Sequence, residues 1–180
     1  MKKYTIGLIT GALLAISAMM FMGSQNKNLG DITVNSIRIL DDGNGGFIKT
    51  YNADGKQTAY LGTGEGGGGK LTTYKTDGKQ TAYLGTGENG IGFLQTYNAD
   101  GKMTGYLGTG ENGIGFLQTY NTDGKLTAYL GTGEGGIGLL QTYNAYGKMT
   151  GYFGTNTDND GMAYLFDRYG DAGWGAEGKQ

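Results

Sequence analysis

The sequence predicts an all-β protein whose tandem β-hairpin repeats form one elongated antiparallel meander. Three observations indicate this fold: a 23-residue period, an Asn-x-Asp-Gly corner or close variant in each repeat, and 39 glycines among 180 residues. Glycine at this level occurs in collagen, in disordered chains and in turn-rich β proteins. Glycine does not recur at every third residue, which excludes collagen, and 14 Tyr with 6 Phe argue against disorder.

Residues 1–23 precede the repeats and have the character of an export segment. Lys2 and Lys3 stand before the uncharged stretch 4–23, an arrangement typical of a signal peptide. About 20 apolar residues also suffice to span a bilayer. We therefore expect an apolar helix that is either a cleaved signal peptide or a retained signal anchor in the membrane, followed by a polar linker at 24–31. In both cases the rest of the chain is expected to be exported to the periplasm, the cell surface or the extracellular space.

The repeats divide the rest of the chain into two caps and a central array. One glycine position recurs every 23 residues, at Gly55, Gly78, Gly101, Gly124, Gly147 and Gly170. A fixed period of this length indicates a repeat architecture in which every unit needs its neighbours. We expect an N-terminal capping half-repeat at residues 32–45, five hairpin repeats at 46–160 and a degenerate C-terminal capping repeat at 161–180.

Each repeat contains two short strand candidates joined by a tight corner. One pair is FLQTYN and KMTGYLGT, which are rich in aromatic and β-branched residues. Between them, Asn98-Ala99-Asp100-Gly101 fits a type I turn followed by a left-handed glycine, which is a G1 bulge. This corner places Asn98 opposite Lys102. The face expected to be buried then carries Phe93, Gln95, Tyr97, Met103, Gly105 and Leu107, and the other face carries Leu94, Thr96, Asn98, Lys102, Thr104 and Tyr106.

Two arrangements of the hairpins are open at this point, a meander and a β-solenoid (β-helix) with one repeat per coil. In a solenoid, equivalent lysines such as Lys79 and Lys102 stack about 4.8 Å apart and repel each other. In a meander they lie two strands apart, at about 9.6 Å. The charge pattern and the corner both favour the meander. A thin sheet with an apolar face also predicts a homo-oligomer.

The repeat has two partial resemblances to known repeats. The stretch YLGTGENGIG, residues 106–115, resembles a MORN repeat at Tyr106 and Gly108, although Gly110 stands where that repeat has an aromatic residue. Residues 32–175 are similar to the tandem hairpin repeats, L-x-x-Y/D-x-x-G-K, of exported bacterial proteins of unassigned role. This resemblance implies an extracytoplasmic β-repeat scaffold and no activity.

The composition excludes several classes of function. The chain has no His and no Cys, and its serines, Ser17, Ser24 and Ser36, lie in or near the export segment. A nucleophile paired with a base is therefore missing, and the repeated Asp residues occupy corners whose geometry favours Asp. A net charge of −2 does not attract nucleic acid. The sequence thus predicts a non-enzymatic protein with a structural or adhesive role at the cell envelope or surface.

Two repeated rows offer alternative binding functions. A flat aromatic row suits sugar rings and predicts a glycan, cell-wall or surface-polysaccharide site, unless the rings only cover apolar neighbours. This row consists of Tyr60, Tyr83, Tyr106, Tyr129 and Tyr152. Rows of threonine predict an ice-binding face, although threonine is also a common strand residue. The recurring threonines are Thr58, Thr81, Thr104, Thr127 and Thr150.

One loop has the pattern of a calcium-binding loop. The segment NTDNDG, residues 156–161, has oxygen-bearing side chains at alternating positions before a glycine. The ligands of this calcium site would be Asn156, Asp158, Asp160 and, as the closing carboxylate, Asp167. Asn, Asp and Gly are also ordinary turn residues, so a plain turn is the alternative. Calcium is the one cofactor that the sequence suggests.

Overall fold

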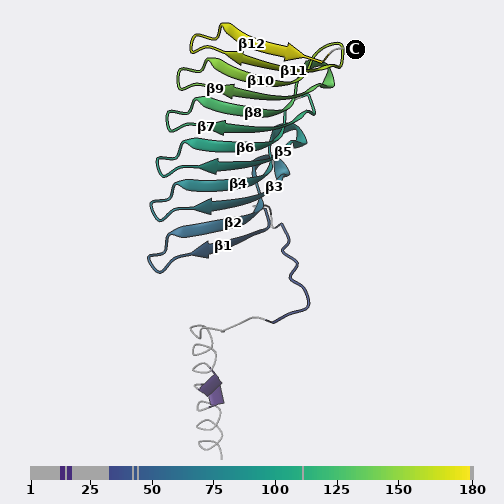
Figure 1. Cartoon of the computed structure of the whole chain (residues 1–180). Coiled ribbons are helices and arrows are strands. Elements are labelled where there is room, and N and C mark those ends of the chain that lie inside the picture. Colours follow the sequence, from purple (N-terminus) through teal and green to yellow (C-terminus); the bar gives the residue numbers. More distant parts are fainter. Residues whose placement is uncertain are drawn as a thin grey trace, which may run out of the picture. The chain divides into compact units, whose positions relative to one another are not determined.

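The computed structural model describes residues 13–14, 16–17, 33–41, 43, 45–110 and 112–178. It contains one sheet of twelve strands in the order β1 to β12 (Figure 1). Strands that are consecutive in the chain pair in antiparallel fashion, and β1 and β12 form the two edges of the sheet. The predicted all-β meander is therefore confirmed, and the solenoid alternative is wrong, because equivalent strands of successive repeats do not pair.

The strands are short and of nearly equal length. Their bounds are β1 Phe47–Tyr51, β2 Gln57–Thr63, β3 Gly69–Tyr74, β4 Gln80–Thr86, β5 Gly92–Tyr97, β6 Met103–Thr109, β7 Gly115–Tyr120, β8 Leu126–Thr132, β9 Gly138–Tyr143, β10 Met149–Thr155, β11 Gly161–Phe166 and β12 Ala172–Glu177. Three short 3-10 turns connect successive hairpins, at Glu65–Gly67 (η1), Glu88–Gly90 (η2) and Glu134–Gly136 (η3). The five expected repeats correspond to β1–β10, and β11 with β12 forms a sixth hairpin in the expected C-terminal cap.

The chain divides into two units, residues 1–38 and residues 39–180, and the second unit holds the sheet. Within the expected apolar segment, residues 13–14 and 16–17 are helical. The rest of that segment and the linker at 24–31 lie outside the described residues. Among the residues that the structure describes, no helix reaches the length and hydropathy that a membrane crossing requires.

The expected N-terminal capping half-repeat, residues 32–45, contains no strand in its described part. Residues 33–41, 43 and 45 form no ladder, and the sheet begins only at Phe47. Isoleucine and valine favour strands only where a neighbouring strand completes the pairing. The apolar residues of this stretch instead stay exposed, as Val34 and Ile37 do.

The corner between the two strands of a hairpin has the predicted geometry. The N–H of Asn98 donates to the carbonyl of Lys102 over 2.9 Å, and the N–H of Gly101 donates to the carbonyl of Asn98 over 3.0 Å. Gly101 has a φ of +83°, in the left-handed region. The side-chain oxygen of Asn98 also accepts the N–H groups of Asp100 and Lys102, each over 3.0 Å. Asn52, Asn121 and Asn144 make the same bonds in their own corners.

Replacing Asn98 with alanine should lower the free energy of unfolding by about 1 kcal/mol, because two backbone N–H groups lose their acceptor. Urea unfolding of the full chain, followed by circular dichroism, measures the change. The matched control is Thr122→Ala, which gives the corner after β7 the alanine that the corner after β5 already has. An equal loss in both variants would contradict the corner role of Asn98.

The register beyond the corner differs from the prediction by one residue. Tyr97 faces Met103 as expected, but Thr96 faces Gly105, and Leu94 faces Leu107 instead of Tyr106. A β-bulge is responsible, since it inserts one extra residue into β6. A one-residue slip moves every following side chain to the opposite face. The predicted faces are therefore wrong for Gly105, Leu107 and Tyr106. All six hairpins show this shift near the corner.

The sheet is a single layer, and nothing in the described part of the chain covers either face. No hydrophobic side chain among the described residues is buried, and Thr72 is the one buried polar residue, at 2% exposure. The expectation that one face is buried is therefore not met within this chain. Contacts between neighbouring strands, each worth roughly 0.2–1 kcal/mol per side-chain pair, take the place of a core.

Candidate functional site

The two faces of the sheet are the candidate functional surfaces, and they differ in composition. The leucine face carries one large apolar side chain at the centre of each of ten consecutive strands. These residues are Ile48, Leu61, Leu71, Leu84, Leu94, Leu107, Leu117, Leu130, Leu140 and Phe153, and each lies directly opposite the next. The ladder continues through Ala163 and Ala176 to the last strand. The aromatic face is the opposite one, and it holds the phenylalanine and tyrosine side chains described next.

The aromatic face contains a continuous stack of five rings across β4 to β8. The rings belong to Tyr83, Phe93, Tyr106, Phe116 and Tyr129, with neighbouring centroids 5.0 to 5.6 Å apart and interplanar angles of 13° to 20°. Such near-parallel contacts each contribute about 0.5–1.5 kcal/mol beyond burial. The stack therefore joins three hairpins along the direction of the repeat.

Glycine makes this stack possible. Gly108 lies opposite Phe93 on the aromatic face, and a Cβ atom there would stand 2.6 Å from the Cβ of Phe93 and 2.9 Å from a ring carbon of Tyr106. Gly131 has the same relation to Phe116, at 2.6 Å. Because these glycines leave space, the tyrosine rings can lean along their strands against the phenylalanine rings, and Tyr106 lies between two of them.

The stack ends where another residue occupies the phenylalanine position. Lys70 takes this position in β3, and its Nζ lies 5.1 Å from the ring centroid of Tyr60. Leu139 takes it in β9, facing Gly131. At the first hairpin, Phe47 stacks on Tyr60 at 5.8 Å, and the Nζ of Lys49 lies 4.3 Å from the Phe47 centroid. At the N-terminal end of the face, cation–π contacts from Lys49 and Lys70 thus accompany one separate ring pair.

The five tyrosines of the predicted glycan row all lie on the aromatic face and are half-buried. The hydroxyls of Tyr60 and Tyr129 donate to the carbonyls of Thr63 and Thr132 over 2.7 and 2.9 Å. Tyr83 and Tyr152 make longer bonds of the same kind, at 3.4 and 3.3 Å. Both ring faces of Tyr106 contact phenylalanine rings. A sugar stacks on a free ring face, so this geometry favours the interpretation that the row packs the sheet.

A second tyrosine row, which the sequence reasoning did not single out, lies near the corners on the same face. The hydroxyls of Tyr97, Tyr120 and Tyr143 each donate to the glutamine two residues earlier in the strand. Burial raises the pKa of all three phenols, and the neighbouring tyrosine of the first row acts in the same direction. The Gln-x-Tyr pattern at the end of alternate strands is the sequence signal for this row.

These raised pKa values predict a loss of stability at alkaline pH. The folded chain holds the phenolic protons more tightly than the unfolded chain, so stability is full below the ordinary tyrosine pKa of about 10 and falls as the pH rises beyond it. Urea midpoints from pH 8 to 11 should fall less in a Tyr97→Phe/Tyr120→Phe/Tyr143→Phe variant than in the wild type. Tyr146→Phe, at a corner residue that is 82% exposed, is the control and should keep the wild-type slope.

The threonines of the predicted ice-binding row lie on the leucine face near the corners. Each hydroxyl bonds to the hydroxyl of a threonine on the preceding strand, as Thr104 does with Thr96 over 3.0 Å. Two threonines thus share one side of the sheet at each bulge of the first five hairpins. Their hydroxyls are engaged with each other, so the structure shows why threonine recurs there independently of any ligand.

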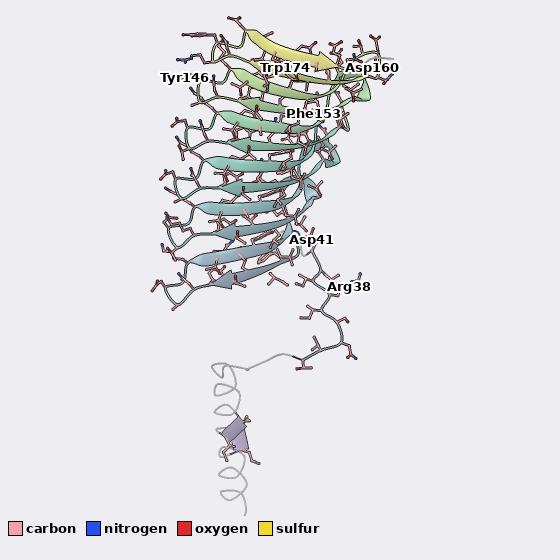
Figure 2. All side chains as sticks on the ribbon, in the orientation of Figure 1. Arg38, Asp41, Tyr146, Phe153, Asp160 and Trp174 are labelled. Carbon is pink, nitrogen blue, oxygen red and sulfur yellow. The ribbon has the colours of Figure 1, made fainter. Side chains whose placement is uncertain are left out.

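The structure does not bring the four residues of the predicted calcium site together. The side-chain oxygen of Asn156 accepts the N–H groups of Asp158 and Asp160, as in the other corners. Asp167 lies at the far end of β11, in the corner before β12. This corner is hydrogen-bonded to the corner that holds Tyr146, because the side-chain amide of Asn144 donates to the carbonyl of Arg168. Figure 2 shows Asp160 and Tyr146 at opposite ends of the strands.

Asp167 has a structural role in its own corner. Its Oδ1 accepts the backbone N–H groups of Asp171 and Tyr169, and these bonds hold the pKa of the carboxyl below its usual value. Among the described residues, no group of three or more acidic side chains is arranged to hold a metal ion. The geometry favours the plain-turn interpretation of residues 156–161.

Comparison with known proteins leaves the description at the level of architecture. No protein-family model matches the chain, and no curated protein is significantly similar to it. The resemblances to MORN repeats and to exported bacterial repeats rest on the quoted residues alone. What the structure shows is a run of antiparallel hairpins with a common corner, bulge and ring position, so the chain is a β-hairpin repeat protein.

Proposed function

We propose that this chain is an exported, non-enzymatic β-repeat protein with a structural or adhesive role at the cell envelope or surface. The observation that carries the proposal is the leucine face. It runs without interruption across all twelve strands, it is exposed, and no Asp, Glu, Lys or Arg lies on it among the strand residues that the structure describes.

The size of this face supports an association function. Twelve strands about 4.8 Å apart extend over about 53 Å, and six residues of strand cover about 20 Å. This uncharged face, with its continuous ladder of large apolar side chains, is larger than the apolar patches of a few hundred Å² that soluble monomers ordinarily expose, and such patches mark contact sites. Each repeat adds another identical strip of the surface, whereas a catalytic site needs one unique constellation of side chains.

The location rests on the N-terminal sequence. Lys2 and Lys3 before an uncharged stretch are typical of an export signal, and the rest of the chain has no Cys that an oxidising compartment would pair. A structural or adhesive protein outside the cytoplasm is consistent with both features.

Cells that express the full chain with a C-terminal epitope tag provide the test. Fractionation should place the tag outside the cytoplasm, and the cells should adhere to methyl-terminated surfaces more strongly than cells without the chain. The variant Leu94→Lys/Leu117→Lys should lose most of this adhesion, because two charges interrupt the leucine face. The matched control, Ala99→Lys/Thr122→Lys, adds the same charge at exposed corners and should retain it. A cytoplasmic tag, or equal adhesion with and without the chain, would contradict the proposal.

A further inference from the structure

We infer that the leucine face is covered by the leucine face of a second copy of this chain, so that two single-layer sheets pack face to face. The inference rests on the proposed function, since it names the partner of the same surface. Four features of the described strands carry it: area, charge, relief and the position of the largest side chains.

The area fits a stable pair. A face of about 53 Å by about 20 Å offers about 1,000 Å² on each copy, with neighbouring sheets packed about 10 Å apart. A specific, stable interface buries roughly 800 Å² per partner. Full overlap of two leucine faces therefore supplies the area of an ordinary dimer, without any contribution from the corners or the connecting turns.

The distribution of charge selects this face over the aromatic one. The aromatic face carries Lys49 and Lys70 among its rings and Glu177 at its last strand. Covering that face with a second sheet would remove these charges from water without a partner, which is costly. The leucine face buries only leucine, threonine, alanine, glycine and a few larger apolar groups. A second copy brings no charge against it.

The relief of the leucine face is self-complementary. Leucines of even-numbered strands protrude more than those of odd-numbered strands: Leu84 and Leu107 are 53% and 54% exposed, whereas Leu94 and Leu117 are 37% and 39% exposed. High and low rows thus alternate with a period of two strands, about 9.6 Å. A second copy displaced by one strand places its high rows over the low rows of the first, which is the interlocking that close packing requires.

At the C-terminal strands, a protruding side chain also lies next to hollows in the leucine face. Phe153 on β10 is 67% exposed and stands between two hollows. One of about 440 Å³ is lined by Leu130, Leu140 and several glycines, and one of about 260 Å³ is lined by Ala163 and Leu165. Side chains of a second copy can enter both hollows, since each is open and apolar. Trp174 on β12, labelled in Figure 2, is the register partner of Leu165 and so lies on the same face.

Light scattering and the fluorescence of Trp174, the single tryptophan, test the pair in the full chain at micromolar concentration in a mild non-ionic detergent. The wild type should have a protein mass of two or more chains and a blue-shifted emission, since pairing covers an indole that is 57% exposed in one copy. Leu94→Lys/Leu117→Lys should have the mass of one chain, a red-shifted emission and an unchanged far-ultraviolet spectrum. Ala99→Lys/Thr122→Lys should behave as the wild type.

A wild-type mass of one chain overturns the inference, and so does a folded leucine-face variant that stays paired. If that variant does not fold, the wild-type mass and its dissociation on dilution, with the accompanying red shift, still decide the question. The outcome is separable from the proposed function. A chain that stays monomeric yet promotes adhesion supports the proposed function and contradicts the pair. In that case an abiotic or membrane surface covers the leucine face. A paired chain that promotes no adhesion supports the pair and contradicts the proposed function.

Discussion

Replacing Gly108 with valine should destabilise the sheet by about 3 kcal/mol, the upper end of the usual cost of overpacking. The new Cβ would lie 2.6 Å from the Cβ of Phe93 and 2.9 Å from the carbonyl oxygen of Gly92, so backbone atoms stand in its way. The rings of Phe93 and Tyr106 would also have to separate. Thermal unfolding of the full chain, followed by circular dichroism, measures the loss.

Gly92 supplies a matched control on the neighbouring strand. A Cβ at Gly92 meets no atom within 4 Å, and its φ is not in the left-handed region. Gly92→Val should therefore be neutral or stabilising, because valine favours strands more than glycine does. Two identical substitutions, one on each face, are thus expected to differ in sign. Equal destabilisation by both would show that the space at Gly108 has no special role.

Replacing Phe116 with alanine should cost about 2–3 kcal/mol, since a half-buried ring and two stacking contacts are lost together. The Phe116 centroid lies 5.1 Å from that of Tyr106 and 5.6 Å from that of Tyr129. Urea unfolding of the full chain measures the change in the free energy of unfolding.

Phe116→Leu is the matched variant, because Leu139 naturally occupies the equivalent position of the next repeat. It should cost about 1 kcal/mol, since apolar contact is retained while stacking is lost. If the leucine and alanine variants lose the same stability, the stack contributes little beyond filling space, and the account of the aromatic face is wrong.

The repeat, the strands and the corners could be predicted because their signals are local. Asn98 and Gly101 specify a turn whose hydrogen bonds are made within five residues. The lysines at equivalent positions then favoured the meander, because in a solenoid they would stack close together and repel each other. All of these features depend on residues that are near one another in the chain.

The register could not be predicted in the same way. The bulge at Thr104 places its hydroxyl beside that of Thr96, and threonine in a strand gives no separate signal of a bulge. Because of this one extra residue, Tyr106 and Leu107 each lie on the face opposite to the predicted one. The predicted register therefore did not show the ring stack or the leucine ladder. A glycine two residues after each tyrosine, as in Tyr106 and Gly108, was the available clue, because the two positions share a face.

The surroundings of the candidate binding residues could not be predicted for a related reason. The tyrosine row was predicted from spacing alone, and spacing does not show that phenylalanine rings cover both faces of Tyr106. The calcium pattern placed Asp167 by its distance along the chain from Asn156. In a meander of six-residue strands, that distance leads to the opposite end of the sheet.

The most direct test of the central claim, that each repeat adds two strands to one single-layer sheet, is a distance between two spin labels. The chain has no cysteine, so Ala53→Cys/Ala145→Cys labels only two equivalent, exposed corner positions that are four repeats apart. Eight strand spacings predict about 38 Å between the labelled corners by pulsed electron paramagnetic resonance, with unlabelled chain added in excess. A distance of about 19 Å, one strand per repeat, would contradict the account.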